Sequence, residues 1–108
     1  MIVPTEAPSN FHLDSLSSSS ISVKWAEIPQ ESRNGEIIGY RVGYYMRFSY
    51  EVVWDSIQVD GQTFKATINN LTEGFSYRIR VAGVTQEGVG VYSSYLTAAP
   101  VLCETELQ

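Results

Sequence analysis

Apolar residues recur at every second position in several short segments of this sequence. In the segment ISVKW, Ile21, Val23 and Trp25 alternate with polar side chains. The same alternation recurs in six further segments, which lie around 11–16, 38–45, 57–60, 64–68, 77–81 and 91–96. A period of two is that of a half-buried strand, and no long window shows the helical period with capping residues. The pattern therefore predicts seven short strands and no long helix.

Turn-forming residues separate these segments at fairly regular intervals. They gather at 15–20, 29–36, 59–62, 69–74 and 86–90. Because one apolar face of a sheet has to be covered, seven such strands indicate an all-β sandwich of two sheets. Residues 1–8 and 99–108 contain prolines and acidic residues without any period, so we expect them to be linkers that flank a single domain at 9–98.

The composition fits a chain that folds around a core of its own. Of 108 residues, 44% are hydrophobic and 18% are charged. The net charge of −5 argues against a nucleic-acid-binding module, which needs a basic face. No segment has the length and apolarity of a membrane span, and the first residues lack the pattern of a secretory signal. We therefore expect a cytosolic protein, or a piece of a longer chain, without direct membrane insertion.

One short stretch raises a structural question, because NLTEGFSYRIRV places a tyrosine at the mouth of a strand. A sandwich has to carry its chain from one sheet to the other before the sixth strand, and this crossing leaves main-chain groups without ladder partners. We expect Leu71 to fill the core before the bend, Gly74 to permit the bend, and the Tyr77 hydroxyl to hydrogen-bond the main chain upstream. This arrangement is shared by several Greek-key families.

Together with Trp25, these motifs resemble the fibronectin type III family. The resemblance covers about residues 8–97 and rests on NFHLDSLSSSSISVKW, NGEIIGYRVGYY and NLTEGFSYRIRVAGVTQEGVGVYS. It implies a seven-stranded antiparallel β-sandwich, an immunoglobulin-like Greek key, in which Trp25, Tyr40, Leu71 and Tyr77 have structural roles. The stretch between Tyr45 and Val59 departs from the family by its many aromatic residues, and the Trp-Ser-x-Trp-Ser box of cytokine receptors is missing.

The resemblance also implies a class of function. Such domains are non-catalytic protein-interaction and spacer modules on the extracellular side of cell-surface receptors, including receptor phosphatases and neural adhesion receptors. The expected partners are adjacent modules or an extracellular protein ligand, and we expect the domain to be monomeric in isolation. Two alternatives stay open, namely an intracellular scaffold domain of the muscle-filament type and an accessory domain of a secreted glycan-degrading enzyme.

Residues that carry chemistry are few. His12 is the only histidine and Cys103 the only cysteine, so the sequence offers no catalytic triad, no zinc site and no internal disulfide. The carboxylates are scattered, and the Gly-x-Gly in EGVGVY lacks the strand-to-helix context of a nucleotide loop. We therefore predict no catalytic residue, no metal and no cofactor, and a protein that is not an enzyme.

Three features are candidates for interaction or modification. Asn70 begins the N-glycosylation sequon Asn-Leu-Thr, although an asparagine there is also a common turn residue. Arg41, Arg78 and Arg80 should share one outer face, either in ion pairs and cation–π contacts or as a site for a sulfated glycan or an acidic partner. The aromatic run 44–54 either packs within the domain or forms a protein interface. Our interface candidates are Met46, Phe48, Tyr50 and Trp54, and, in a second loop, Gln86 and Glu87.

Overall fold

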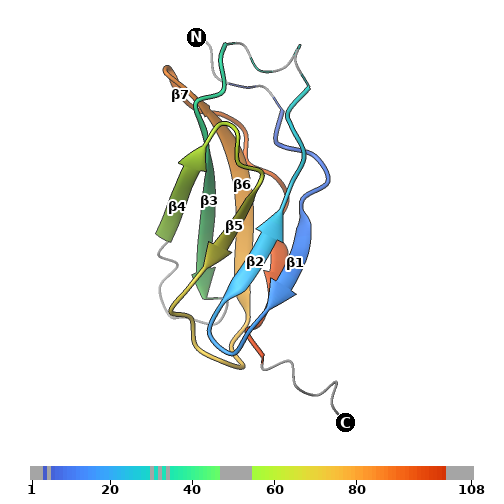
Figure 1. Ribbon diagram of the computed structural model, residues 1–108, viewed down its shortest axis with the longest axis vertical. Helices are drawn as coiled ribbons and strands as arrows, with labels where there is room; N and C mark the ends of the chain where they lie inside the picture. The colour runs from blue at the N-terminus through green and yellow to red at the C-terminus, as the bar shows by residue number, and fades with distance from the viewer. Residues whose placement is uncertain are drawn as a thin grey trace.

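Two antiparallel sheets form the part of the chain that the computed structural model describes, residues 4, 6–29, 31, 33, 35–46 and 55–101. One sheet has the strand order β1-β2-β5, and the other has the order β4-β3-β6-β7 with β8 also paired to β6 (Figure 1). The strands are β1 (His12–Leu16), β2 (Ile21–Lys24), β3 (Gly39–Met46), β4 (Asp55–Asp60), β5 (Lys65–Ile68), β6 (Tyr77–Thr85), β7 (Gly88–Val89) and β8 (Leu96–Ala98). The predicted all-β sandwich is confirmed.

Alternating side chains of the two sheets meet in the core between them. Along β6, Tyr77, Ile79 and Val81 are buried, whereas Arg78 and Arg80 between them are half-buried. The buried cluster comprises Ile21, Val23, Trp25, Ile28, Tyr40, Val42, Ala66, Ile68, Tyr77, Ile79 and Val81. Burying a large aliphatic side chain contributes about 1.5–3 kcal/mol, most of which chain entropy offsets. This shared burial holds the two sheets face to face.

The last predicted strand, 91–96, is wrong in its position. Residues 91–95 form no regular strand, and the chain instead pairs with β6 in two short pieces, β7 before this segment and β8 at its end. Between the two pieces, the Val81 N–H donates to the Ser93 hydroxyl at 3.0 Å, and the Ser93 N–H donates to the Val81 carbonyl at 2.8 Å. A side-chain oxygen thus takes the place of a main-chain carbonyl, and the regular ladder is interrupted there.

The crossover from β5 to β6 is held by the tyrosine that opens β6. The Tyr77 hydroxyl accepts a hydrogen bond from the Thr72 N–H at 2.9 Å. Gly74 adopts a φ of 85°, which a residue with a Cβ rarely reaches, and half-buried Leu71 packs against the core. The bend therefore satisfies a main-chain donor that no neighbouring strand reaches.

Buried prolines fix the chain at opposite ends of the sandwich. Pro4 and Pro100 are both fully buried. Pro4 packs on Gly90, where a Cβ would lie 2.7 Å from the Pro4 carbonyl oxygen, close to the β6–β7 end of the molecule. At the other end of β6, the Pro100 carbonyl accepts the Gly74 N–H at 2.9 Å. The described chain thus enters at one pole and leaves at the other, and both points are packed against the domain.

Candidate functional site

The outer face of the five-stranded sheet carries arginines from two adjacent strands. In the antiparallel pairing of β3 with β6, Tyr45 lies opposite Arg78 and Gly43 lies opposite Arg80. Directly paired residues share a face of the sheet, and the buried Ile79 between the two arginines points to the other face. The half-buried Arg41 lies further along β3 on this same outer face. Alternation along both strands therefore brings the three arginines together.

Tyrosines stack against two of these arginines. The Arg80 guanidinium carbon lies 4.0 Å from the centre of the Tyr92 ring, and that of Arg78 lies 5.4 Å from the centre of the Tyr95 ring. Arg78 Nη1 also donates to the Tyr45 hydroxyl at 3.4 Å, and the Tyr45 and Tyr95 rings meet edge to face at 6.4 Å. Cation–π contacts contribute about 0.5–2 kcal/mol and restrain both partners. We call Tyr45, Arg78, Arg80, Tyr92 and Tyr95 the Arg–Tyr stack.

Positive charge is concentrated around this stack in an otherwise acidic chain. Seven lysines and arginines stand against twelve acidic residues, and three of the seven are Arg41, Arg78 and Arg80. Beside the stack, Arg41 donates to the Gln58 side-chain oxygen at 3.3 Å. The ion pairs between described residues lie elsewhere, in Lys24–Asp14 at 3.5 Å and Arg33–Glu27 at 3.3 Å. Three of the chain's seven basic residues therefore lie on this face.

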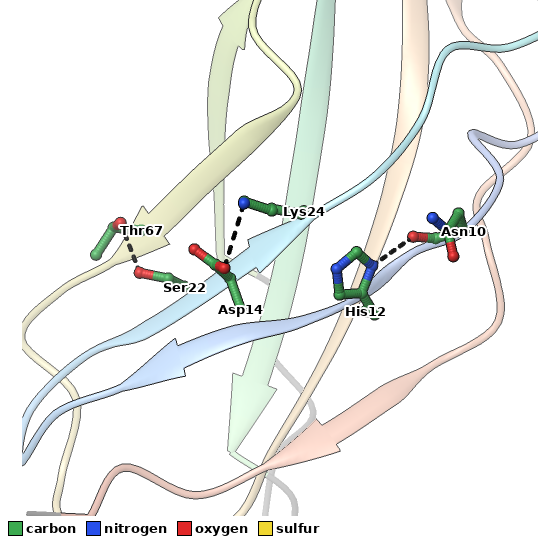
Figure 2. Close-up of polar contacts among 6 residues, drawn as sticks. All are labelled: Asn10, His12, Asp14, Ser22, Lys24 and Thr67. Atoms are coloured by element: carbon green, nitrogen blue, oxygen red, sulfur yellow. Dashed lines mark hydrogen bonds and ion pairs between the residues drawn. The ribbon is translucent and has the colours of Figure 1, made fainter. Parts of the chain in front are cut away.

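The outer face of the three-stranded sheet has short-range polar contacts instead. Figure 2 shows three of them, which are Ser22–Thr67 between hydroxyls at 2.8 Å, Lys24–Asp14 at 3.5 Å, and His12 Nδ1 with the Asn10 carbonyl oxygen at 2.7 Å. The imidazole thus bonds to a main-chain carbonyl, and neither hydroxyl in the figure lies in a contact with it. Among the six residues labelled in Figure 2, no hydroxyl is therefore activated by a base.

A surface depression of about 430 Å³ lies where β2 ends and β5 begins. It is lined by Lys24, Trp25, Gln62, Thr63, Phe64 and Lys65. The Trp25 indole N–H beneath it is buried and forms no hydrogen bond with any described residue. Ammonium, amide and hydroxyl groups line the depression, but none of the six is a carboxylate or an imidazole. Proton transfer at neutral pH therefore has no evident base in this depression.

Two tyrosines of β3 have shifted pKa values, and neither shift points to catalysis. Burial raises the pKa of the Tyr40 hydroxyl, and burial together with the nearby Asp55 charge raises the pKa of Tyr44, so both stay neutral at physiological pH. Within residues 4–101 as described, no three His, Cys, Asp or Glu side chains gather as they would around a metal ion. None of the described residues forms a helix with the length and hydropathy that a bilayer crossing requires.

Comparison with known proteins gives the family. Residues 6–99 match the family model of the fibronectin type III domain. This chain belongs to the fibronectin type III family. Its structure also superimposes on the third fibronectin III domain of the human KIAA0343 protein with a TM-score of 0.85, 22% identity, and coverage of 93% of this chain and 85% of that one.

Relatives of this fibronectin type III domain occur in cell-adhesion receptors. It is 35% identical over 95 residues to contactin-3 of Rattus norvegicus and 32% identical over 96 residues to neogenin of Homo sapiens. These alignments cover 88% and 89% of the domain, but only 9% and 6% of the two relatives. The domain is thus similar to one module of receptors many times its length.

The described part of this fibronectin type III domain places three of the predicted interface residues, Met46, Gln86 and Glu87, and the interface stays a prediction. Met46 is half-buried and packs against the core cluster, so part of its surface is used inside the domain. Phe48, Tyr50 and Trp54 lie outside the described residues. Gln86 and Glu87 are exposed at the tip of the β6–β7 hairpin, where the Glu87 N–H donates to the Thr85 hydroxyl at 3.2 Å.

Sequence reasoning missed the two tyrosines that complete the Arg–Tyr stack. Tyr92 and Tyr95 lie in the segment that was expected to be a regular strand. Their place in the sequence, shortly after the sixth strand, could have indicated them. A segment that borders the sixth strand, and that carries two aromatic residues three positions apart, can place both beside the arginines of that strand.

Proposed function

We propose that this fibronectin type III domain is a non-catalytic protein-binding and spacer module in the extracellular part of a cell-surface adhesion receptor. The observation that carries the proposal is the Arg–Tyr stack, a basic and aromatic surface on the open face of an acidic domain. Similarity to contactin-3 and neogenin supports the receptor over the muscle-type scaffold and the accessory domain of a glycan-degrading enzyme.

The stack suits recognition of carboxylates. A guanidinium presents several N–H donors in a planar fork, which matches a carboxylate in two parallel hydrogen bonds. Arg78 is already restrained by the Tyr95 ring and the Tyr45 hydroxyl, so it loses less side-chain entropy on binding than a free arginine does. Arginine and tyrosine are also the residue types that most often dominate binding energy at interfaces.

The net negative charge of the chain favours a short acidic protein segment over a long polyanion as the partner. A net charge of −5 repels long polyanions at a distance, whereas a short acidic segment of a protein meets mainly the local field of the face. We therefore propose an acidic segment of a partner protein as the occupant. Sulfated polysaccharide is the competing ligand, and the experiment distinguishes the two.

The spacer role is supported by the way in which the chain is fixed at both poles. Pro4 is packed on Gly90 at one pole, and Pro100 is bonded to Gly74 at the other. Because Pro4 and Pro100 are buried against the domain at opposite poles, the described chain leaves the domain in two fixed places, which suits a spacer.

The binding proposal is tested with a labelled peptide of alternating glutamate and serine, titrated into isotopically labelled domain. We expect chemical-shift changes on β3 and β6, and Arg78→Gln should weaken binding about fivefold, near the upper end for an exposed charge pair. Lys65→Gln removes the same charge from the other sheet and is the matched control. Two results would contradict the proposal. One is equal weakening by both variants. The other is heparin binding that depends on Arg78 while the peptide causes no shift changes on β3 and β6.

A further inference from the structure

The connection between β5 and β6 contains a sequon whose asparagine and threonine both face solvent. Asn70 and Thr72 are exposed, whereas Leu71 between them is half-buried and packs against the core. The inward leucine thus turns its two neighbours outward. The sequon Asn-Leu-Thr is the acceptor pattern for N-linked glycosylation, which requires the asparagine amide and the hydroxyl two residues later.

The fold uses the main chain of this segment for hydrogen bonds but not the polar side chains of Asn70 and Thr72. The Leu71 N–H donates to the Ser19 carbonyl at 2.9 Å, and the Thr72 N–H donates to the Tyr77 hydroxyl at 2.9 Å. Among the described contacts, neither the Asn70 amide nor the Thr72 hydroxyl forms a side-chain hydrogen bond. The backbone is therefore a fixed platform from which the Asn70 side chain extends into solvent.

The backbone conformation accounts for an asparagine at position 70, but it does not account for a threonine at position 72. Asn70 has a φ of 62°, a left-handed value that asparagine tolerates better than most residues. Asn10 has a similar φ of 55°, and there the residue two positions later is His12 rather than a serine or threonine. A turn asparagine in this domain thus does not require a hydroxyl residue after it, whereas glycosylation does.

We propose that Asn70 carries an N-linked glycan, an inference that rests on the extracellular function proposed above. In the reaction, Asn70 Nδ2 attacks C1 of a sugar on a lipid-pyrophosphate-linked oligosaccharide. An N-glycosidic bond forms, the bond between C1 and the phosphate oxygen breaks, Nδ2 loses one proton, and the lipid pyrophosphate leaves. The donor is a membrane lipid of the secretory pathway, and the transferase of that pathway catalyses the step.

The position of Asn70 sets which surfaces the glycan covers. The Leu71–Ser19 bond and the nearby Gly74–Pro100 bond place the sequon close to Pro100. The connection between β5 and β6 lies at the end of the sandwich from which the chain leaves after β8 (Figure 1). The hairpin tip with Gln86 and Glu87 lies beyond the opposite end of β6. The glycan therefore shields the pole of Pro100 and leaves the hairpin pole open to protein contact.

The test is secretion of this chain from animal cells behind an added signal sequence, followed by intact mass analysis. We expect a glycan mass that peptide N-glycosidase removes with conversion of the asparagine to aspartate. Thr72→Ser should keep the glycan, and Thr72→Ala should abolish it without changing the melting temperature of the unglycosylated domain, since the Thr72 N–H remains. A secreted wild-type chain at its bare peptide mass would overturn the site.

This outcome is separable from the proposed function. The added signal sequence delivers the chain to the transferase whatever its natural location, so a missing glycan contradicts the modification alone. The peptide titration uses bacterially produced domain without any glycan, so its failure contradicts the binding face alone.

Discussion

Replacing Tyr77 by phenylalanine removes a single oxygen atom from the crossover between the two sheets. The side chain is only 6% exposed, and its ring packs in the core cluster, so the phenylalanine ring should occupy the same space. What the variant loses is the hydrogen bond from the Thr72 N–H to the hydroxyl, which is 2.9 Å long. The substitution therefore isolates one contact at the bend that leads into β6.

The size of the loss follows from the surroundings of the two partners. A neutral hydrogen bond contributes about 0.5–1.5 kcal/mol net, and a buried donor left without a partner costs about 1–3 kcal/mol. Thr72 is exposed, so water can reach its amide in part, and the expected loss lies near the overlap of these ranges, at about 1–1.5 kcal/mol. For a domain of this size such a loss lowers the melting temperature by roughly 4–10 °C.

Urea unfolding at equilibrium measures this loss, with Tyr40→Phe as the matched control. Tyr40 is 2% exposed in the same core, but its hydroxyl forms no hydrogen bond with a described residue, so its loss should change stability by less than about 0.5 kcal/mol. The midpoint of the Tyr77 variant should fall while the m-value stays constant. Equal losses in the two variants would show that the hydroxyl does not hold the crossover.

Two further predictions concern one end of the domain and one turn. Gly90→Ala should destabilise the domain by about 1–3 kcal/mol, because the new methyl group would lie 2.7 Å from the Pro4 carbonyl oxygen. In a chain without residues 1–5, thermal melts should show little effect of the same substitution. A full effect in that shortened chain would refute the contact. The pKa of Asp60 is lowered by hydrogen bonds, first from the Thr63 hydroxyl and then from main-chain N–H groups, so its contribution to stability is present above the unfolded pKa and is lost as the pH falls through the lower folded pKa. Thr63→Val should raise this pKa in a carbon-detected NMR titration of the carboxyl group, and an unchanged pKa would refute the assignment.

Alternation predicted most of the sheet faces because it is a local property of the chain. Val42 and Tyr40 on β3, and Ile79 and Val81 on β6, are buried as a period of two requires. The same rule failed at 91–96, where a serine hydroxyl replaces a main-chain carbonyl in the pairing with Val81. Such an exchange depends on the neighbouring strand, and a pattern within one segment does not report it.

Alternation predicted the arginines of the Arg–Tyr stack but not their aromatic partners, because it too is a property of one segment. Arg78 and Arg80 were expected on the outer face, because each lies between buried residues of one strand. Their ring partners Tyr92 and Tyr95 come from a segment more than ten residues away, and only the path of the chain between β7 and β8 sets them beside β6.

By itself, therefore, the sequence determined the all-β sandwich, its inward faces and the absence of an evident catalytic motif, because these follow from residue types and short-range spacing. Tertiary structure alone decided the Arg–Tyr stack, the break at Ser93 and the packing of Pro4 and Pro100 at opposite poles. Each of these depends on the register between segments that are distant in the chain. That register is set by the sum of many weak contacts across the whole core, and no single segment encodes it.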